Sequence, residues 1–232
     1  MNRILLLMWL LIGLAINMGY AGTIKLNASE WPPYTSEKAE GLGQTSIKVE
    51  KTLKKMGMGA KIQFMNWAEA IKFSDGAMAF FPAYACKARK GLASLPVGYS
   101  ALGFAERPGA KVQWKDLADL GRYRIGVVAG YYNSEAFDWA LAQGQLSVIE
   151  FPNDEANIQA LVTKQIDLAV IDPSVLAGLQ QEDNKNNSNL VNRLVMNERL
   201  LETKIPLYVC FKNNFKGKRL LRSFNQALKT NS

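Results

Sequence analysis

Apolar and polar residues follow each other in two different patterns along the chain, and these patterns predict alternating strands and helices. Short runs that alternate or are wholly apolar are typical of β-strands. They cover residues 23–27, 61–64, 77–81, 124–129, 148–151 and 167–171. Apolar residues three or four positions apart indicate helices over residues 45–56, 68–73, 114–120, 134–142 and 156–163. Strands that alternate with helices favour a mostly parallel sheet with helices on both faces.

The order of elements occurs twice, in residues 67–82 and in residues 157–173. Each stretch predicts a helix, a short turn, an apolar strand and then a proline, Pro82 in the first and Pro173 in the second. Residue identity between the stretches is low and there are two copies, so they do not form a solenoid repeat. They predict two similarly built lobes. The most polar segment, residues 181–189, contains no apolar residue, which predicts a surface loop.

The N-terminus has the pattern of a secretory signal peptide. Arg3 supplies the positive charge, residues 4–16 form an uncharged apolar run, and residues 19–21, Gly-Tyr-Ala, place small residues at a cleavage site. A membrane anchor is the alternative, but an apolar run of about 13 residues is short of the roughly 20 that cross a bilayer. No cysteine near the cleavage site offers a thiol for lipidation. We therefore expect cleavage after Ala21 and a soluble periplasmic protein.

The net charge of +8 raises the question of a nucleic-acid partner. The basic residues are scattered along the chain, which indicates solvated faces, with a mild bias toward anionic ligands as the alternative. The chain has no histidine, the commonest general base and metal ligand, so we expect no enzyme, no cofactor and no metal site. Cys86 and Cys210 could form one disulfide or remain two buried thiols, and the sequence leaves both open.

Several short motifs occur in a characteristic order. They are Trp31-Pro-Pro-Tyr34, Gly41-Leu-Gly43 before a helix, Trp67 in NWAEAI, Asp75-Gly76 before a strand, Arg89 followed by SLPVGYS, then KDLADLGRYRIGVVAGYY and IDLAVIDPSV. Each motif is weak alone. Together, over residues 23–228, the chain resembles the periplasmic solute-binding proteins of family 3, which bind polar amino acids for ABC transporters.

The resemblance implies an α/β fold of the two-lobed periplasmic binding protein type II class, with a ligand cleft between lobes joined by two crossing strands. It places the crossing strands near residues 102–107 and 202–206, and a C-terminal helix around residues 220–228. The expected domains are a signal peptide at residues 1–21, a first lobe at residues 22–103 plus 204–232, and a second lobe at residues 104–203.

The resemblance also implies two charged ligand contacts. Arg89 stands where relatives place the arginine that grips a ligand carboxylate, a task for which its planar fork of donors is suited. Asp172 matches the acid that holds the ligand's ammonium group, at the carboxyl end of an apolar strand. The alternatives are that Arg89 is one more surface cation and that Asp172, which precedes a proline, forms a turn.

The remaining residues implied as ligand contacts are aromatic. They are Trp31, Tyr34, Trp67, Tyr84, Tyr131 and Tyr132. For Trp67 the alternative is burial in the core of its own lobe. Residues 83–86 replace the serine and threonine that relatives carry before the arginine, and residues 131–133 replace small hydroxyl residues at a helix start. These departures leave the specificity for amino acids open.

The resulting hypothesis is a monomeric binding protein for a small polar ligand, an amino acid or a related carboxylate, that delivers it to an inner-membrane ABC permease. A sensory or orphan binding module with the same fold is the alternative. A cleft enzyme is less favoured because the sequence offers no catalytic set.

Overall fold

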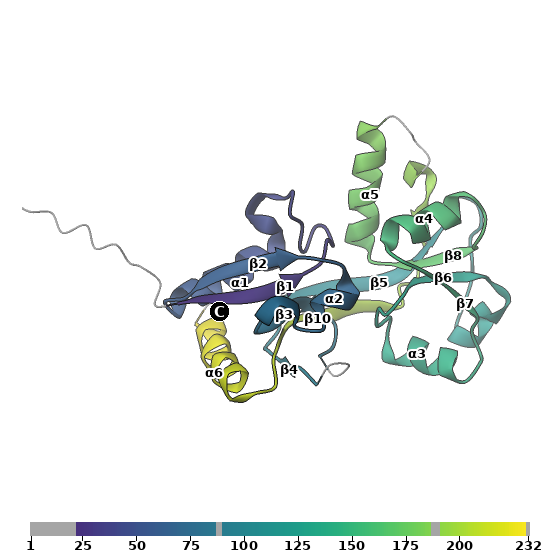
Figure 1. Ribbon diagram of the computed structural model, residues 1–232. Helices are drawn as coiled ribbons and strands as arrows, with labels where there is room; N and C mark the ends of the chain where they lie inside the picture. The colour runs from purple at the N-terminus through teal and green to yellow at the C-terminus, as the bar shows by residue number, and fades with distance from the viewer. Residues whose placement is uncertain (1–21, 87–89, 187–190, 231–232) are drawn as a thin grey trace, which may run out of the picture.

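The computed structural model describes residues 22–86, 90–186 and 191–230 (Figure 1). Its strands are β1 (Thr23–Ala28), β2 (Gly59–Phe64), β3 (Ala79–Ala83), β4 (Leu92–Ala93), β5 (Gly98–Glu106), β6 (Ile125–Val128), β7 (Val148–Phe151), β8 (Leu168–Ile171), β9 (Val195–Met196) and β10 (Glu202–Phe211). Its α-helices are α1 (Gln44–Lys55), α2 (Trp67–Ala70), α3 (Glu135–Ala142), α4 (Asp154–Val162), α5 (Pro173–Lys185) and α6 (Phe215–Lys229). Within these described ranges, no helix has the length and apolar character needed to span a membrane.

Two parallel sets of strands are joined by two long antiparallel strands. The strand order is β2-β1-β3-β10-β5-β8-β6-β7, in which β1 pairs in parallel with β2 and β3, and β6 pairs in parallel with β7 and β8. Strands β5 and β10 pair antiparallel with each other and with the sets on either side. In Figure 1 they run between two groups of elements, one with α1, α2 and α6 and the other with α3, α4 and α5. The predicted parallel arrangement is therefore correct within each set, and the sheet as a whole is mixed.

The helices cover the sheet through apolar faces that match the predicted spacing. Val49 and Leu53 of α1 are fully buried, and Phe224 of α6 packs on Phe211 of β10 with ring centroids 5.4 Å apart. In the other group, Phe137 of α3 is fully buried in the cluster that contains the β6 and β8 side chains. Burial of each such side chain contributes on the order of 2 kcal/mol.

Four sequence predictions need correction. The helix predicted at residues 114–120 is a 3-10 helix at Leu117–Arg122, which begins after the cap residue Asp116. Strand β3 continues through Pro82, because its pairing with β10 is irregular between Tyr208 and Cys210 and leaves room for a residue without an N–H. The predicted helix 68–73 ends at Ala70, since the chain adopts left-handed φ angles of 56° at Phe73 and 54° at Asp75. The segment 181–189 was predicted to be a loop, but α5 extends to Lys185.

A disulfide joins Cys86 to Cys210, which answers the question that the sequence left open. Their Cα atoms are 5.4 Å apart and both residues are buried. The bond links the segment after β3 to the long strand β10.

Candidate ligand-binding site

The site lies where strands from both groups end. Trp31 follows β1, Tyr84 follows β3, and Tyr131 and Tyr132 follow β6. The carboxyl ends of parallel strands meet at one edge of a sheet, and this edge is where open α/β sheets bind ligands. Here the two edges face each other, so that a cavity of about 450 Å³ opens between them.

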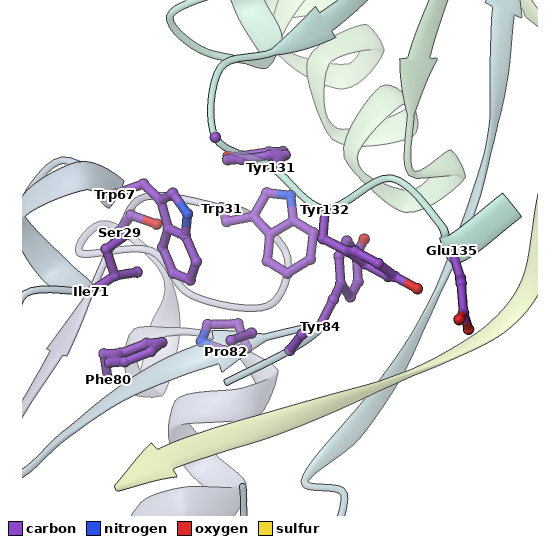
Figure 2. A pocket seen from close by; sticks show the side chains of 13 residues that line it. Ser29, Trp31, Trp67, Ile71, Phe80, Pro82, Tyr84, Tyr131, Tyr132 and Glu135 are labelled. Atoms are coloured by element: carbon purple, nitrogen blue, oxygen red, sulfur yellow. The ribbon is translucent and has the colours of Figure 1, made fainter. Parts of the chain in front are cut away.

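The lining of this cavity is mostly aromatic and apolar (Figure 2). It consists of Ser29, Trp31, Trp67, Ile71, Phe80, Pro82, Ala83, Tyr84, Ala85, Gly130, Tyr131, Tyr132 and Glu135. Cavities of this size commonly hold small molecules. Phe80 and Pro82 form one side in Figure 2, Tyr131 lies opposite them, and Glu135 lies at the edge beyond Tyr132.

Five rings from the two groups of elements contact one another, and we call them the aromatic cluster. Its members are Trp31, Trp67, Tyr84, Tyr131 and Tyr132. Trp31 meets Tyr84 edge-on with centroids 5.4 Å apart. Tyr131 lies 6.4 Å from both Trp31 and Trp67, and Tyr132 lies 6.4 Å from Tyr84. Such edge-to-face arrangements are favourable for aromatic pairs. The cluster therefore connects the β1–β3 side of the cavity with the β6 side.

The loop that carries Trp31 is fixed by local hydrogen bonds. The Trp31 N–H donates to the Thr35 carbonyl at 2.8 Å, and the Thr45 hydroxyl donates to the Tyr34 carbonyl at 2.8 Å. Gly43 has a φ of 97°, and a Cβ there would lie 2.6 Å from the backbone carbonyl oxygen of Tyr34. Only glycine fits this close approach. The glycine at the end of the Gly41-Leu-Gly43 motif thus has a steric reason.

Asp172 joins the two sides through hydrogen bonds. Its carboxylate accepts from the Tyr34 hydroxyl at 2.8 Å, from the Ser100 hydroxyl, and from the Ala101 N–H at 3.2 Å. The same carboxylate caps α5 by accepting from the N–H groups of Ser174 at 2.6 Å and Val175 at 3.3 Å. The alternative that the sequence offered for Asp172 was a turn; the residue is instead the N-cap of α5 and stabilises the helix N-terminus.

The Asp172 network extends to two tyrosines. Tyr84 and Ser100 share a hydrogen bond of 2.8 Å between their hydroxyl groups. Burial, followed by the charge of Asp172 and the hydrogen bond to it, raises the pKa of Tyr34 to about 12. Burial also raises the pKa of Tyr84. Both hydroxyls therefore stay protonated and able to donate.

A second acid lies beside this network. Asp154, in the first turn of α4, is 8% exposed and lines a small cavity together with Asp172 and members of the aromatic cluster. Burial, then the charges of Glu155 and Asp172, raises the pKa of Asp154 to about 7. The sequence prediction missed Asp154, which lies three residues after the end of β7 at Phe151, whereas Asp172 directly follows β8.

The structure places seven of the eight predicted contacts at this location. Five form the aromatic cluster, Asp172 lines the small neighbouring cavity, and Tyr34 contacts Asp172 without lining the large one. Arg89 lies outside the described residues. Besides Asp154, the prediction missed Ser29, Phe80, Pro82 and Glu135. Ser29 and Pro82 also lie at the carboxyl ends of their strands, so the strand-edge rule marks them.

The described part of the chain contains no cluster of three or more histidine, cysteine, aspartate or glutamate side chains that could hold a metal ion. Nor does any lysine or arginine of the described residues line the large cavity. The chemistry of the described lining is therefore that of aromatic faces, a few hydroxyl groups and one carboxylate at its edge.

Comparison with solved structures identifies the class of fold. The chain matches no protein-family model, and no curated protein matches it in sequence. Solved structures match nearly all of it at low identity, and they include proteins bound to arginine and to L-glutamate. The chain has the two-lobed periplasmic binding protein type II fold, as the sequence predicted.

Three of these structures show the range of proteins with this fold. An ancestral arginine-binding protein bound to arginine is 17% identical with a TM-score of 0.72, and the match covers 91% of this chain and 92% of that one. The GluR0 ligand-binding core from Nostoc punctiforme in complex with L-glutamate is 20% identical, with coverage of 89% and 92% and a TM-score of 0.65. A histidine kinase sensor domain with similarity to periplasmic binding proteins is 16% identical, with coverage of 90% and 89% and a TM-score of 0.70.

Proposed function

We propose that the chain is a periplasmic binding protein that captures a small polar ligand in the cavity between its two lobes. The observation that carries this proposal is the cavity of about 450 Å³ lined by rings from both sides. A ligand that contacts both sides stabilises the closed arrangement. Structures of the same fold are described as bound to arginine and to L-glutamate, which supports an amino acid or a related carboxylate.

The remaining parts of the hypothesis come from the sequence. Residues 1–21 act as a cleaved export signal, residues 22–103 plus 204–232 form one lobe, and residues 104–203 form the other. Arg89 binds the ligand carboxylate, and the loaded protein acts as a monomer that delivers the ligand to an ABC permease. The absence of histidine from the sequence supports a binding role rather than an enzymatic one.

A sensory role is the second candidate, because a histidine kinase sensor domain has the same fold. In that role the closed, loaded state contacts a signalling partner instead of a permease. Gene neighbourhood distinguishes the two candidates, since permease and ATPase genes accompany an importer and a sensor gene accompanies a signalling module.

The direct test is a thermal-shift screen of residues 22–232 with amino acids, methylated amines and small organic acids. Binding to the folded state raises the free energy of unfolding by RT ln(1 + [L]/Kd), which is about 2.7 kcal/mol at a hundredfold excess over Kd, and so raises the melting temperature. We expect at least one class to bind at micromolar Kd in calorimetry. If no compound shifts the melting temperature at millimolar concentration, the proposed function is wrong.

A substitution at Arg89 tests the proposed contact with the ligand carboxylate. We expect Arg89→Ala to abolish binding of the carboxylate ligand and to leave the melting temperature of the unliganded protein nearly unchanged. Lys90→Ala, which removes the adjacent exposed cation, is the matched control and should bind normally. Equal binding by both variants would exclude Arg89 from the site.

A further inference from the structure

The aromatic cluster lines one cavity with rings from both groups of elements. Trp31, Trp67, Tyr84 and Tyr131 contribute rings to the cavity lining, and Tyr132 adds a fifth at its edge (Figure 2). Aromatic faces carry negative quadrupole charge and attract cations, and several faces around one space form the cage that recognises quaternary ammonium groups.

The protein's own cations do not occupy these ring faces. Among the described residues, the cations that lie over a ring use rings outside the aromatic cluster. These pairs are Arg122 over Tyr123, Arg199 over Trp114, Lys204 over Tyr99 and Lys212 over Phe73. The described lining likewise contains no lysine or arginine. The cluster is therefore open to a cation supplied by a ligand.

The number of N–H donors on a ligand cation, compared with the acceptors that the cavity offers, decides which kind of cation the cavity can hold. A primary ammonium carries three N–H donors and a guanidinium carries five, and each donor buried without an acceptor costs about 1–3 kcal/mol. The Tyr84 hydroxyl already shares a hydrogen bond with Ser100. The Glu135 carboxylate lies at the edge of the ring group. A quaternary ammonium, such as a trimethylammonium group on carbon, has no N–H that needs an acceptor, so it suits this lining best.

Negative charge behind the rings favours the same ligand. Asp154 and Asp172 line the small neighbouring cavity together with Trp31, Tyr84, Tyr131 and Tyr132. Four rings thus have the large cavity on one side and two buried acids close by. The carboxylate of Asp172, close to this aromatic wall, adds to the attraction for a positive charge, and water screens it little at this depth.

We propose that the aromatic cluster is a cage for a trimethylammonium group, and that the ligand is a small methylated ammonium compound. This inference rests on the proposed function, because it names the ligand class of the same cavity.

Three compounds of similar size test the cage, and calorimetry on residues 22–232 provides their affinities. Glycine betaine carries a trimethylammonium group, 3,3-dimethylbutanoate replaces its nitrogen by carbon, and glycine replaces its methyl groups by hydrogen. We expect glycine betaine to bind at least about tenfold more tightly than either of the others, since a desolvated cation–π contact contributes this much. Choline and tetramethylammonium extend the series to compounds without a carboxylate.

The outcomes separate this inference from the proposed function. Equal binding of glycine betaine and 3,3-dimethylbutanoate would show a merely apolar cavity and overturn the cage. Binding of glycine, L-arginine or another unmethylated amino acid, without any methylated ammonium compound, would overturn the cage and keep the proposed function. Failure of every compound in the screen would overturn both.

A matched pair of variants locates the contact. Tyr131→Phe keeps the ring, whereas Tyr131→Leu keeps an apolar side chain and removes the ring. We expect normal binding of glycine betaine by the first and about tenfold weaker binding by the second. Trp67→Phe and Trp67→Leu form a second pair in case a Tyr131 variant does not fold, as judged by its melting curve. Equal affinities within both pairs would show that the rings are not a cage.

Discussion

Asp154 is an unusual residue because it is an acid buried without a basic partner. It is 8% exposed, and no hydrogen bond or ion pair to its carboxylate occurs among the described residues. Asp167 offers a contrast within the same group of elements. It pairs with Arg124 at 2.8 Å and Arg107 at 3.2 Å, and these contacts lower its pKa to about 2. The two aspartates therefore have pKa values shifted in opposite directions, because their surroundings differ.

The buried acid predicts a pH dependence of stability. The pKa of Asp154 is about 7 when folded against an ordinary value of 3.8, so between these values the folded state binds a proton that the unfolded state lacks. Stability from this group is present at low pH and is lost as pH rises through about 7. We expect Asp154→Asn to raise the urea midpoint near pH 8 and to have little effect near pH 4. Glu150→Gln, at an exposed position of β7, is the control and should change neither midpoint.

At the scale of elements, close contact between β6 and α4 positions the loop that carries Tyr131. The Asn157 side chain of α4 donates to the carbonyl groups of Gly126 at 3.4 Å and Val170 at 3.1 Å, and so ties the helix to β6 and β8. Gly126 makes room for it, because a Cβ there would lie 2.1 Å from the Asn157 oxygen and 2.4 Å from Ile166. The pattern of apolar residues does not predict this close approach of α4 to β6.

Gly126→Ala is therefore expected to destabilise the protein by about 2 kcal/mol, since the added methyl group displaces a packed helix. Gly178→Ala provides the matched control in α5, where an added Cβ meets nothing within 4 Å. Because alanine is the better helix former, this variant should gain up to about 1 kcal/mol. Urea unfolding of both variants measures the difference, and a loss of the same size in both would contradict the packing argument.

At the scale of the whole molecule, the disulfide between Cys86 and Cys210 closes a long loop. The two residues are 124 positions apart, and the intervening chain includes all of β5 to β9. A cross-link over such a distance removes much of the conformational freedom of the unfolded chain. It also holds the end of β3, near the aromatic cluster, against β10.

We expect the double variant Cys86→Ala/Cys210→Ala to lose about 5 kcal/mol of unfolding free energy, as loop-closure entropy indicates for a loop of this length. Calorimetry with and without a phosphine reductant measures the loss. The reductant should lower the melting temperature of the parent protein and leave the double variant unchanged. A parent protein that is indifferent to complete reduction would show that the bond does not contribute to stability.

The sequence predicted the type of most elements because side-chain periodicity is local. Residues 148–151 were predicted as a strand and form β7, and the apolar positions Val49 and Leu53 lie on the buried face of α1. The predictions failed where distant parts of the chain decide the structure. Pro82 remains in β3 because the β10 register is irregular there.

The sequence by itself determined most strands and helices in their order, and its resemblance to the family 3 proteins pointed to the residues of the aromatic cluster and to Asp172. Tertiary structure alone decided that Cys86 meets Cys210, that Asp154 is buried, and that Tyr34 and Ser100 donate to Asp172. Periodicity follows from the geometry of one strand or helix. Burial, pKa and ring contacts depend instead on which elements face each other across the cavity, and only the folded chain fixes that pairing.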